Sequence, residues 1–386
     1  MENCSVIYVL DKNFNSGEII KSYLEEFNLG YEVKIFSDYN EGIKAIKKDD
    51  NHPIVFVDIS NDDKNSLIKT LETIKLFTSK IIITSTDYST NTIVKAMRMG
   101  AKEFLPKPVL KQDLKRVITM FCLQQNLGDD TASKIITIYS NKGGIGKTTI
   151  ASNLAIELAK ATHDKVALID LNLQLGDIST FLNLNPTFDV AYVIKNLIDK
   201  KEETLIKAFE QYKDSSLYIL SDPNYIEQSE SITPQEIDSL FTALKKIFPY
   251  IIVDMSSNID PNSLKILDKS DWILFTTIVN IPAIRNAQRC LNLFRSRRYP
   301  NNRVKLIINR YMENDEIKIE DIETTLGEKV YWKVPNNYFT IMESINKGIP
   351  VSDVNANSNI ANSFKDLAIK ISDDIVEQAI INYRGR

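Results

Sequence analysis

A glycine-rich loop, Asn141-Lys-Gly-Gly-Ile-Gly-Lys-Thr-Thr149, constrains the fold of this chain more than any other feature. An apolar run at residues 135–139 comes directly before it, and a helical pattern at residues 149–161 follows. A strand, a glycine loop and a helix in this order bind phosphate, because backbone N–H groups approach phosphate oxygens where no Cβ stands in the way. The sequence therefore predicts a nucleotide-binding α/β domain.

The side chains of this loop imply specific contacts with a nucleotide. We expect Lys147 to reach the β and γ phosphates of ATP, and the Thr148 hydroxyl to ligate Mg²⁺. The N-terminus of the following helix adds a partial positive charge. A glycine-rich turn without a ligand is the alternative, which the flanking strand and helix disfavour. The expected cofactor-binding residues of the loop are Lys142, Gly143, Gly144, Ile145, Gly146, Lys147, Thr148 and Thr149.

Two apolar runs downstream, at residues 166–169 and 250–253, end in carboxylates, Asp170 and Asp254. A carboxylate at the carboxyl edge of a parallel strand beside a phosphate loop can hold Mg²⁺, directly or through water. Taken singly, either Asp would as readily begin a turn. With the loop upstream, we expect Thr148, Asp170 and Asp254 to form the metal site.

The loop departs from the strict GxxxxGK[ST] pattern, because Asn141 stands where the first Gly is required and Lys142 follows it. The resulting KGGxGK[ST] pattern resembles the deviant Walker A loop of the MinD/ParA superfamily of ATPases. The resemblance implies that Lys142 crosses a dimer interface to the partner's nucleotide. It also implies that Asn309, followed by Arg310, reads the adenine, although Asn after a strand is a common turn residue as well.

The same resemblance maps Asp170 and Asp254 onto the Walker A′ and Walker B strands of the family. Relatives read D-x-D at the first of these strands, and the second carboxylate helps to orient the attacking water. This chain reads Asp170-Leu-Asn172, and an amide can hold a water but cannot act as a base. With Lys142, Lys147 and Asn172 as the expected catalytic set, we predict ATP binding with slow or no hydrolysis.

A second α/β pattern precedes the ATPase pattern. Apolar runs at residues 6–10, 54–57, 81–83 and 103–105 alternate with amphipathic helical stretches, which predicts a parallel sheet. A polar stretch without periodicity then separates the two patterns. A length of 386 residues fits two or three domains at roughly 150 residues each. We expect a first domain at 1–122, a linker at 123–134 and a P-loop ATPase domain with a mostly parallel sheet at 135–386.

The first domain resembles a flavodoxin-like response-regulator receiver, on the evidence of Asp11, Asp58, Ser85 and Lys107. The resemblance implies phosphoryl transfer to Asp58 with Mg²⁺ held by an acidic cluster. The second acid after the first strand is replaced by Lys12, whose ammonium would take the place of the metal's charge. We therefore expect an atypical receiver that docks without phosphorylation, while a phosphorylated Asp58 and a signalling output protein stay open as an alternative.

Two further segments indicate one branch of the MinD/ParA superfamily. Leu171-Asn-Leu-Gln-Leu-Gly-Asp177 is similar to the DLDLQFGD segment of TadZ/CpaE proteins, and residues 334–350 resemble their "iPndy…a.n.G.P" segment. A receiver ahead of a deviant Walker ATPase is also the TadZ/CpaE arrangement. The resemblance implies an ATP-clamped homodimer, joined through its ATPase domain, that localises the Tad (Flp-type) pilus secretion machinery at a cell pole. Its expected partners are Tad assembly proteins or a polar landmark. A ParA/MinD-type partitioning or positioning ATPase is the alternative.

Composition supplies mainly exclusions. The net charge of −4 gives no global argument for nucleic acid, but residues 272–312 contain no acid and many basic residues between positions 285 and 310. We expect a solvated helix face there; an anionic partner such as DNA stays open and is not favoured. Three cysteines and two histidines, far apart, exclude a disulfide framework or zinc ribbon.

The sequence shows no secretory signal and no stretch long and apolar enough to cross a bilayer, so we expect a cytoplasmic protein on the inner face of the membrane at the pole. An amphipathic pattern at 363–383 is expected to pack on the core rather than on lipid.

Overall fold

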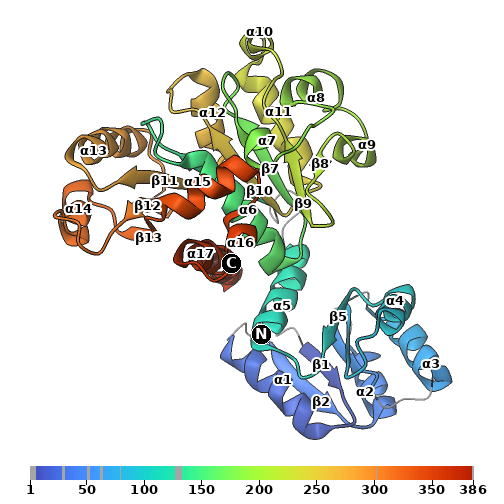
Figure 1. The fold of residues 1–386 in the computed structure, drawn as a ribbon. Coiled ribbons are helices and arrows are strands. Elements are labelled where there is room, and N and C mark those ends of the chain that lie inside the picture. The colour runs from blue at the N-terminus through green and yellow to red at the C-terminus, as the bar shows by residue number, and fades with distance from the viewer. Residues whose placement is uncertain are drawn as a thin grey trace. The chain divides into compact units, whose positions relative to one another are not determined.

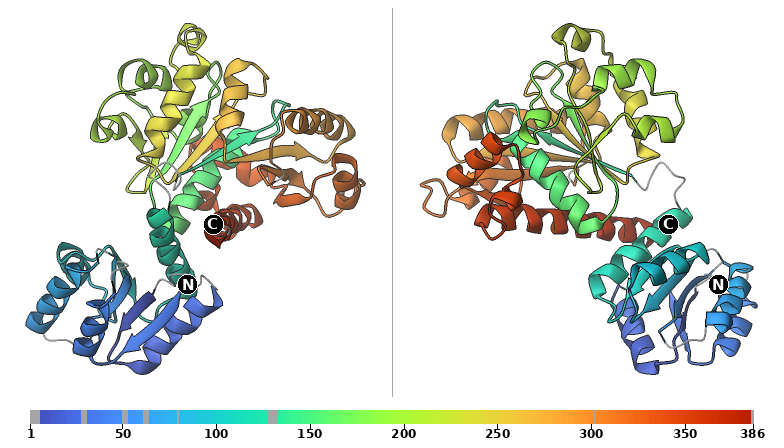
Figure 2. Two further views of the ribbon diagram at one scale, coloured as in Figure 1. Left: turned by 180° about the vertical axis from the view of Figure 1, so that it is seen from behind. Right: turned by 45° about the vertical axis from the view of Figure 1, so that its right-hand side comes forward.

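The computed structural model describes residues 6–27, 31–49, 53–60, 64–78, 80–126, 133–300 and 302–384. The chain divides into two compact units, Met1–Asn126 with Ile375–Arg386, and Leu127–Asp374 (Figure 1, Figure 2). The division falls inside the linker expected at 123–134, of which residues 127–132 lie outside the described residues. It groups residues 375–386 with the first unit, whereas the ATPase domain predicted from the sequence extends to residue 386.

Five parallel strands form the sheet of the first unit, in the order β2-β1-β3-β4-β5. This order is that of flavodoxin-like folds, as the sequence predicts. The strands are β1 (Val6–Leu10), β2 (Glu32–Phe36), β3 (Ile54–Asp58), β4 (Ile81–Ser85) and β5 (Glu103–Pro106). The helices are α1 (Phe14–Glu26), α2 (Tyr39–Ile46), α3 (Lys64–Lys75), α4 (Thr90–Arg98) and α5 (Lys111–Asn126).

Alternation along the strands sends side chains to two cores, because successive residues of a strand face opposite sides of the sheet. In β1, Ile7 and Val9 join a core with buried residues of α1 and α5. Tyr8 and Leu10 join a second core with buried residues of α2, α3 and α4. The sheet is thus covered on both faces, and the polar residues that follow its strands lie at its carboxyl edge.

Eight strands form the sheet of the second unit, in the order β13-β12-β11-β6-β10-β7-β9-β8, and every neighbouring pair is parallel except β8 with β9. The strands are β6 (Lys134–Tyr139), β7 (Val166–Leu171), β8 (Glu210–Gln211), β9 (Leu217–Leu220), β10 (Tyr250–Met255), β11 (Trp272–Ile278), β12 (Val304–Tyr311) and β13 (Val330–Pro335). The helices are α6 (Lys147–Thr162), α7 (Ile178–Phe181), α8 (Val190–Asn196), α9 (Glu202–Ile206), α10 (Ile226–Glu230), α11 (Pro234–Lys245), α12 (Pro261–Lys269), α13 (Ile281–Ser296), α14 (Ile319–Leu326), α15 (Tyr338–Lys347), α16 (Val351–Val354) and α17 (Asn359–Arg384).

The helix α6 follows the central strand β6 and packs against β6, β7 and β10. It is buried on nearly all sides, including polar Asn153, whose side-chain oxygen accepts the Val351 N–H at 2.9 Å. Because β6, β7, β10 and β12 are parallel, their carboxyl ends gather at one edge beside the start of α6. Ligands of open α/β sheets bind at this edge.

The C-terminal helix α17 was expected to pack on the core through an apolar stripe. Phe364, Leu367, Ala368 and Ile371 are all buried, which confirms that prediction for these residues. Among the helices in the described part of the chain, none is long and apolar enough to cross a membrane.

Candidate functional site

The loop between β6 and α6 adopts the conformation that its glycines allow. Gly144 and Gly146 have φ angles of +71° and +94°, in the left-handed region that side chains rarely enter. A Cβ at Gly146 would lie 2.5 Å from the Asn309 amide nitrogen, so any other residue would displace that side chain. A Cβ at Gly143 or Gly144 would meet no atom within 4 Å, because the backbone there faces open space.

A cavity of about 620 Å³ opens over this loop. Its lining comes from the loop, the start of α6, the segment after β7 and the segment after β10. That volume lies within the range of small-molecule sites, roughly 300–1,000 Å³. The sequence-predicted residues that line it are Gly143, Gly144, Gly146, Lys147, Thr148, Thr149, Asn172 and Arg310.

Thr148 lines the cavity and contacts Asp254, which is buried and does not itself line the cavity. The Thr148 hydroxyl donates to Asp254 Oδ2 at 2.5 Å. The other carboxylate oxygen, Oδ1, is buried and has no hydrogen-bond partner. Burial raises the pKa of Asp254 to about 6, while the Thr148 hydrogen bond and the Lys147 charge oppose the shift. An orphaned buried carboxylate oxygen beside a hydroxyl suits a hard divalent cation, so these residues fit Mg²⁺.

Lys147 supplies one of the positive charges at the site. Its Nζ donates to the Ser257 hydroxyl at 2.7 Å, across the cavity from β10. Burial lowers the pKa of Lys147, and the nearby charge of Asp254 partly opposes that shift. Ser257 was not singled out from the sequence, because a serine in a loop 110 residues away carries no motif of its own.

Asp170 lies beside Asp254, since β7 and β10 pair in register at these two residues. Its Oδ1 accepts the Asn172 N–H at 3.0 Å, and its Oδ2 accepts the N–H groups of Asp177 and Ile178 at 3.0 and 3.2 Å. Burial, followed by the charges of Asp254 and Asp222, raises the pKa of Asp170 well above its usual value. Three backbone donors thus occupy its oxygens, and this arrangement favours Asp254 as the direct metal ligand.

Asn172 is engaged within its own loop. Its side-chain Nδ2 donates to the Leu175 carbonyl, a bond that a carboxylate could not form. Leu175 itself is 73% exposed at the rim of the cavity. Asn172 therefore lines the cavity, and its amide also braces the loop, a contact that no sequence motif indicates.

Asn309 and Arg310 hold the phosphate loop from β12. The Asn309 Nδ2 donates to the Ile145 carbonyl at 2.6 Å, and the Arg310 guanidinium donates to the Gly144 carbonyl at 2.8 Å. Asn309 is 8% exposed. Arg310 lines the cavity and Asn309 is buried against the loop, so the role of Asn309 in reading the adenine stays a prediction.

The first two residues of the loop differ in their contacts. Asn141 Nδ2 donates to the Asn286 carbonyl of α13 at 2.9 Å, so the residue that replaces Gly ties the loop to a neighbouring helix. The Lys142 backbone N–H donates to the Ser140 hydroxyl at 3.2 Å. The ammonium of Lys142 forms no ion pair with any residue in the described ranges, which leaves it available to an anion from outside.

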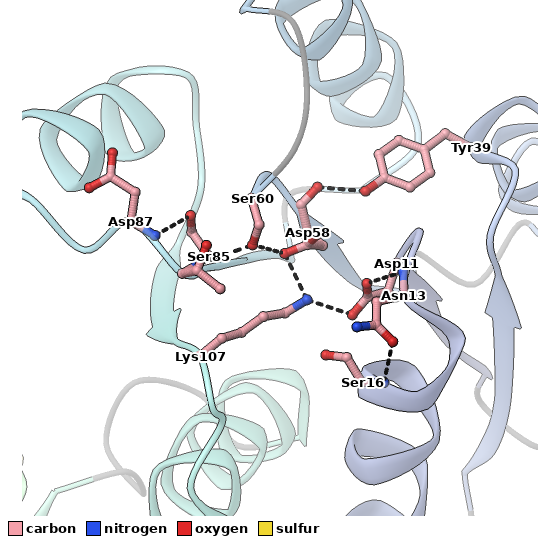
Figure 3. Close-up of polar contacts among 10 residues, drawn as sticks. Asp11, Asn13, Ser16, Tyr39, Asp58, Ser60, Ser85, Asp87 and Lys107 are labelled. Carbon is pink, nitrogen blue, oxygen red and sulfur yellow. Dashed lines mark hydrogen bonds and ion pairs between the residues drawn. The ribbon is translucent and has the colours of Figure 1, made fainter.

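The four residues singled out in the first unit also come together, at the carboxyl edge of its sheet (Figure 3). The Lys107 ammonium lies 2.7 Å from Asp11 Oδ2 and 2.8 Å from Asp58 Oδ1. The Ser85 hydroxyl accepts the Asp87 N–H at 3.1 Å. Lys12 was expected to supply the charge between the acids; the ammonium found there is that of Lys107, whereas Lys12 Nζ lies 5.6 Å from the centre of the Tyr39 ring.

Comparison with known proteins now identifies both units. A family model described as "AAA domain" matches residues 133–306, and one described as "Response regulator receiver domain" matches residues 7–119. The septum site-determining protein MinD of Thermotoga maritima is 31% identical over 245 residues, which cover 61% of this chain and 87% of that protein. The chain belongs to the MinD/ParA superfamily of ATPases.

Solved MinD/ParA structures share the fold of the second unit. A ParA family ATPase from Chlorobium tepidum TLS is 25% identical, with a TM-score of 0.58 over 61% of this chain and 99% of that one. The cell division ATPase MinD of Pyrococcus furiosus, at 22% identity, has a TM-score of 0.55 and covers 62% of this chain. A receiver domain followed by a P-loop ATPase domain is thus the architecture that the sequence predicts.

The basic stretch of this MinD/ParA domain is largely engaged within the fold. Arg295 donates to the Leu326 carbonyl at 2.6 Å, Arg297 to Asp268 at 2.6 Å, and Lys305 lies 5.0 Å from the centre of the Trp272 ring. The exposed basic side chains of the stretch that form no ion pair with the described residues are Arg285, Arg289, Arg298 and Arg310, of which Arg310 contacts the phosphate loop. Exposed arginines fit both a solvated helix face and an anionic partner, so the solvated face stays a prediction.

Proposed function

We propose that the second unit binds ATP with Mg²⁺ and acts as a nucleotide-switched positioning ATPase. The observation that carries the proposal is the Asp254 carboxylate, whose buried Oδ1 has no partner while its Oδ2 accepts from Thr148. Mg²⁺ would neutralise the phosphates and take Asp254 and Thr148 as ligands. The backbone of Gly143 and Gly144 faces open space, where it can donate to phosphate oxygens.

We further infer that nucleotide clamps two copies together through Lys142. This ammonium has no ion pair among the described residues and stands inside the phosphate loop. Three exposed apolar residues follow strands at the same carboxyl edge: Leu175 after β7, Ile259 after β10 and Ile281 after β11, at 73%, 48% and 68% exposure. Exposed apolar side chains at the same sheet edge as a cation suit burial by a second copy of the chain.

The proposed dimer hydrolyses ATP slowly or not at all. Asn172 stands where relatives place a carboxylate, and its amide donates to Leu175 within the loop. Neither the amide nor Asp170, whose oxygens accept three backbone N–H groups, is placed as a free base for water. A long-lived ATP state suits a protein that marks a position.

The finer proposal is a TadZ/CpaE-type factor that localises the Tad pilus secretion machinery at a cell pole. Its support is the order of the two domains and the resemblance of residues 171–177 and 334–350 to segments of that family. Under this proposal the receiver domain docks the assembly partners or a polar landmark. A partitioning ATPase that binds DNA is the alternative, and its support is limited to the exposed Arg285, Arg289 and Arg298.

Localisation of a fluorescent fusion tests the finer proposal. We expect one fluorescent focus at a cell pole. The focus should persist when variants with altered ATP hydrolysis replace the wild type. A signal spread over the nucleoid would favour the partitioning ATPase instead. So would DNA binding by the purified protein that weakens at high salt. Binding of ATP with Mg²⁺ by the purified chain tests the broader proposal separately, and its absence would overturn both.

A further inference from the structure

The acid pocket of the receiver domain contains an ion triad of Asp11, Lys107 and Asp58 (Figure 3). One ammonium lies within 2.8 Å of both carboxylates, which come from the ends of β1 and β3. The side chains are nearly inaccessible, with exposures of 1% for Asp11, 9% for Lys107 and 4% for Asp58. Water therefore screens these charges poorly, and the three groups hold one another in place.

Neighbouring groups complete the contacts of this ion triad. The Ser60 hydroxyl donates to Asp58 Oδ1 at 2.7 Å and accepts the Thr86 N–H at 3.0 Å. The Tyr39 hydroxyl donates to the Asp58 carbonyl at 2.6 Å. Ser60 thus links the segment after β3 to the segment after β4. The pocket is closed by its own side chains.

A receiver fold implies Mg²⁺ beside the phosphoacceptor, and the residues present do not fit it. Mg²⁺ takes oxygen ligands in a near-octahedral arrangement. In the described ranges, no group of three or more acidic, His or Cys side chains is placed to hold a metal. Asp11 and Asp58 bear two negative charges and Lys107 one positive charge, so the ion triad keeps one net negative charge before any cation enters. A dication gains little from two carboxylates that already share a buried ammonium.

We propose that the receiver domain neither binds Mg²⁺ in this pocket nor accepts a phosphoryl group on Asp58, because Lys107 permanently takes the role of the cation. The ion triad holds the ends of β1, β3 and β5 in one arrangement, and the domain presents an unchanging surface. Any regulation of the protein then acts at a site other than this pocket. This inference does not depend on nucleotide binding by the second unit.

A chemical phosphodonor tests the proposal directly. The full chain is incubated with acetyl phosphate and Mg²⁺, and its intact mass is compared with that of Asp58→Asn. We expect no phosphoryl adduct on either protein. An adduct that is present on the wild type and absent from Asp58→Asn would overturn the proposal.

Thermal unfolding without nucleotide tests the role of Lys107. Lys107→Ala is expected to lower the Tm of the receiver domain by about 5 °C or more, because it leaves two buried carboxylates without their cation. Lys102→Ala, which removes an exposed lysine of the same unit, is the matched control and should leave the Tm unchanged. Equal Tm values for the two variants would contradict the proposal.

The response to Mg²⁺ separates the ion triad from a metal site. We expect millimolar Mg²⁺ to leave the Tm of the wild-type receiver domain unchanged. Lys12→Asp adds a third carboxylate and reverses the local charge, so Mg²⁺ should raise its Tm. A Mg²⁺-dependent rise in the wild type that Asp58→Asn abolishes would overturn the proposal, and an unresponsive Lys12→Asp would contradict the charge argument.

Discussion

The Thr148 hydroxyl lies 2.5 Å from Asp254 Oδ2, and the second oxygen of that carboxylate is buried without a partner. Thr148 opens α6 and Asp254 lies in β10, 106 residues later. Because this oxygen is buried, water does not satisfy it, and it can accept a metal ion or a hydrogen bond at the phosphate loop. We therefore expect nucleotide binding at this site to depend on Asp254 more than on the neighbouring Asp170.

Asp254→Asn is expected to weaken binding of ATP in the presence of Mg²⁺ at least about tenfold, or 1.4 kcal/mol. The amide keeps the shape of the side chain but removes the charge that holds the metal. Titration calorimetry with Mg²⁺ and with EDTA measures the effect. Asp199→Asn, an exposed residue outside the cavity, is the control. Equal affinities for wild type and Asp254→Asn would refute the metal assignment.

The same carboxylate predicts a pH dependence of stability in the absence of metal. Burial raises the pKa of Asp254 from 3.8 to about 6, so the folded state favours the neutral acid. Its contribution to stability is complete below about pH 4 and is lost as the pH rises through 6, by up to about 3 kcal/mol. Urea unfolding in EDTA at pH 4.5 and pH 7 measures this loss. Asp254→Asn should lose less stability than the wild type over this interval, and an equal loss would count against the assignment.

The sequence predicts the strands that are buried on both faces. Apolar runs such as 135–139 and 250–253 are recognisable because each side of the strand meets a helix layer. The edge strands β2 and β13 escape prediction, since most of their residues are at least partly exposed and charged residues interrupt the apolar ones. Residues Glu32, Lys34 and Lys333 fit an edge strand, but they resemble loop residues in a sequence.

The sequence predicts those residues of the two sites that belong to recognisable motifs. The motif at residues 141–149 implies the strand before it and the helix after it, and Lys147 and Thr148 line the cavity. Contacts between distant loops were not predicted, because hydrogen bonds such as Lys147 to Ser257 or Asn141 to Asn286 leave no spacing pattern. In the receiver domain the sequence identifies the charges but not their pairing, and Lys107 rather than Lys12 lies between the acids.

Lys142→Ala is expected to abolish dimer formation in ATP while leaving the monomer folded, because it removes the cation proposed to reach the partner's nucleotide. Light scattering gives the mass of wild type and variant with ATP and with ADP. Lys165→Ala removes an exposed lysine at the opposite edge of the sheet and should dimerise normally. One mass for the wild type and Lys142→Ala in both nucleotides would rule out the ATP-clamped dimer.

Asn172→Asp is expected to raise the rate of ATP hydrolysis about 10²-fold, because a carboxylate can assist the attacking water. It also breaks the hydrogen bond to Leu175 and adds a charge beside Asp170, so a lower Tm is expected. Asn172→Ala loses the same hydrogen bond without gaining a base, and should lower the Tm without raising turnover. Wild-type turnover close to that of Asn172→Asp would refute the proposed slow hydrolysis.

Asn309→Ala distinguishes a residue that braces the loop from one that reads the base. Because Asn309 Nδ2 donates to the Ile145 carbonyl, its loss should loosen the phosphate loop and weaken ATP and GTP by a similar factor, about five- to tenfold for one buried hydrogen bond. Competition binding of the two nucleotides measures both affinities. Asn286→Ala is the control, since only its backbone carbonyl contacts the loop, through Asn141. A selective loss of ATP affinity, with GTP unchanged, would instead assign Asn309 to the adenine.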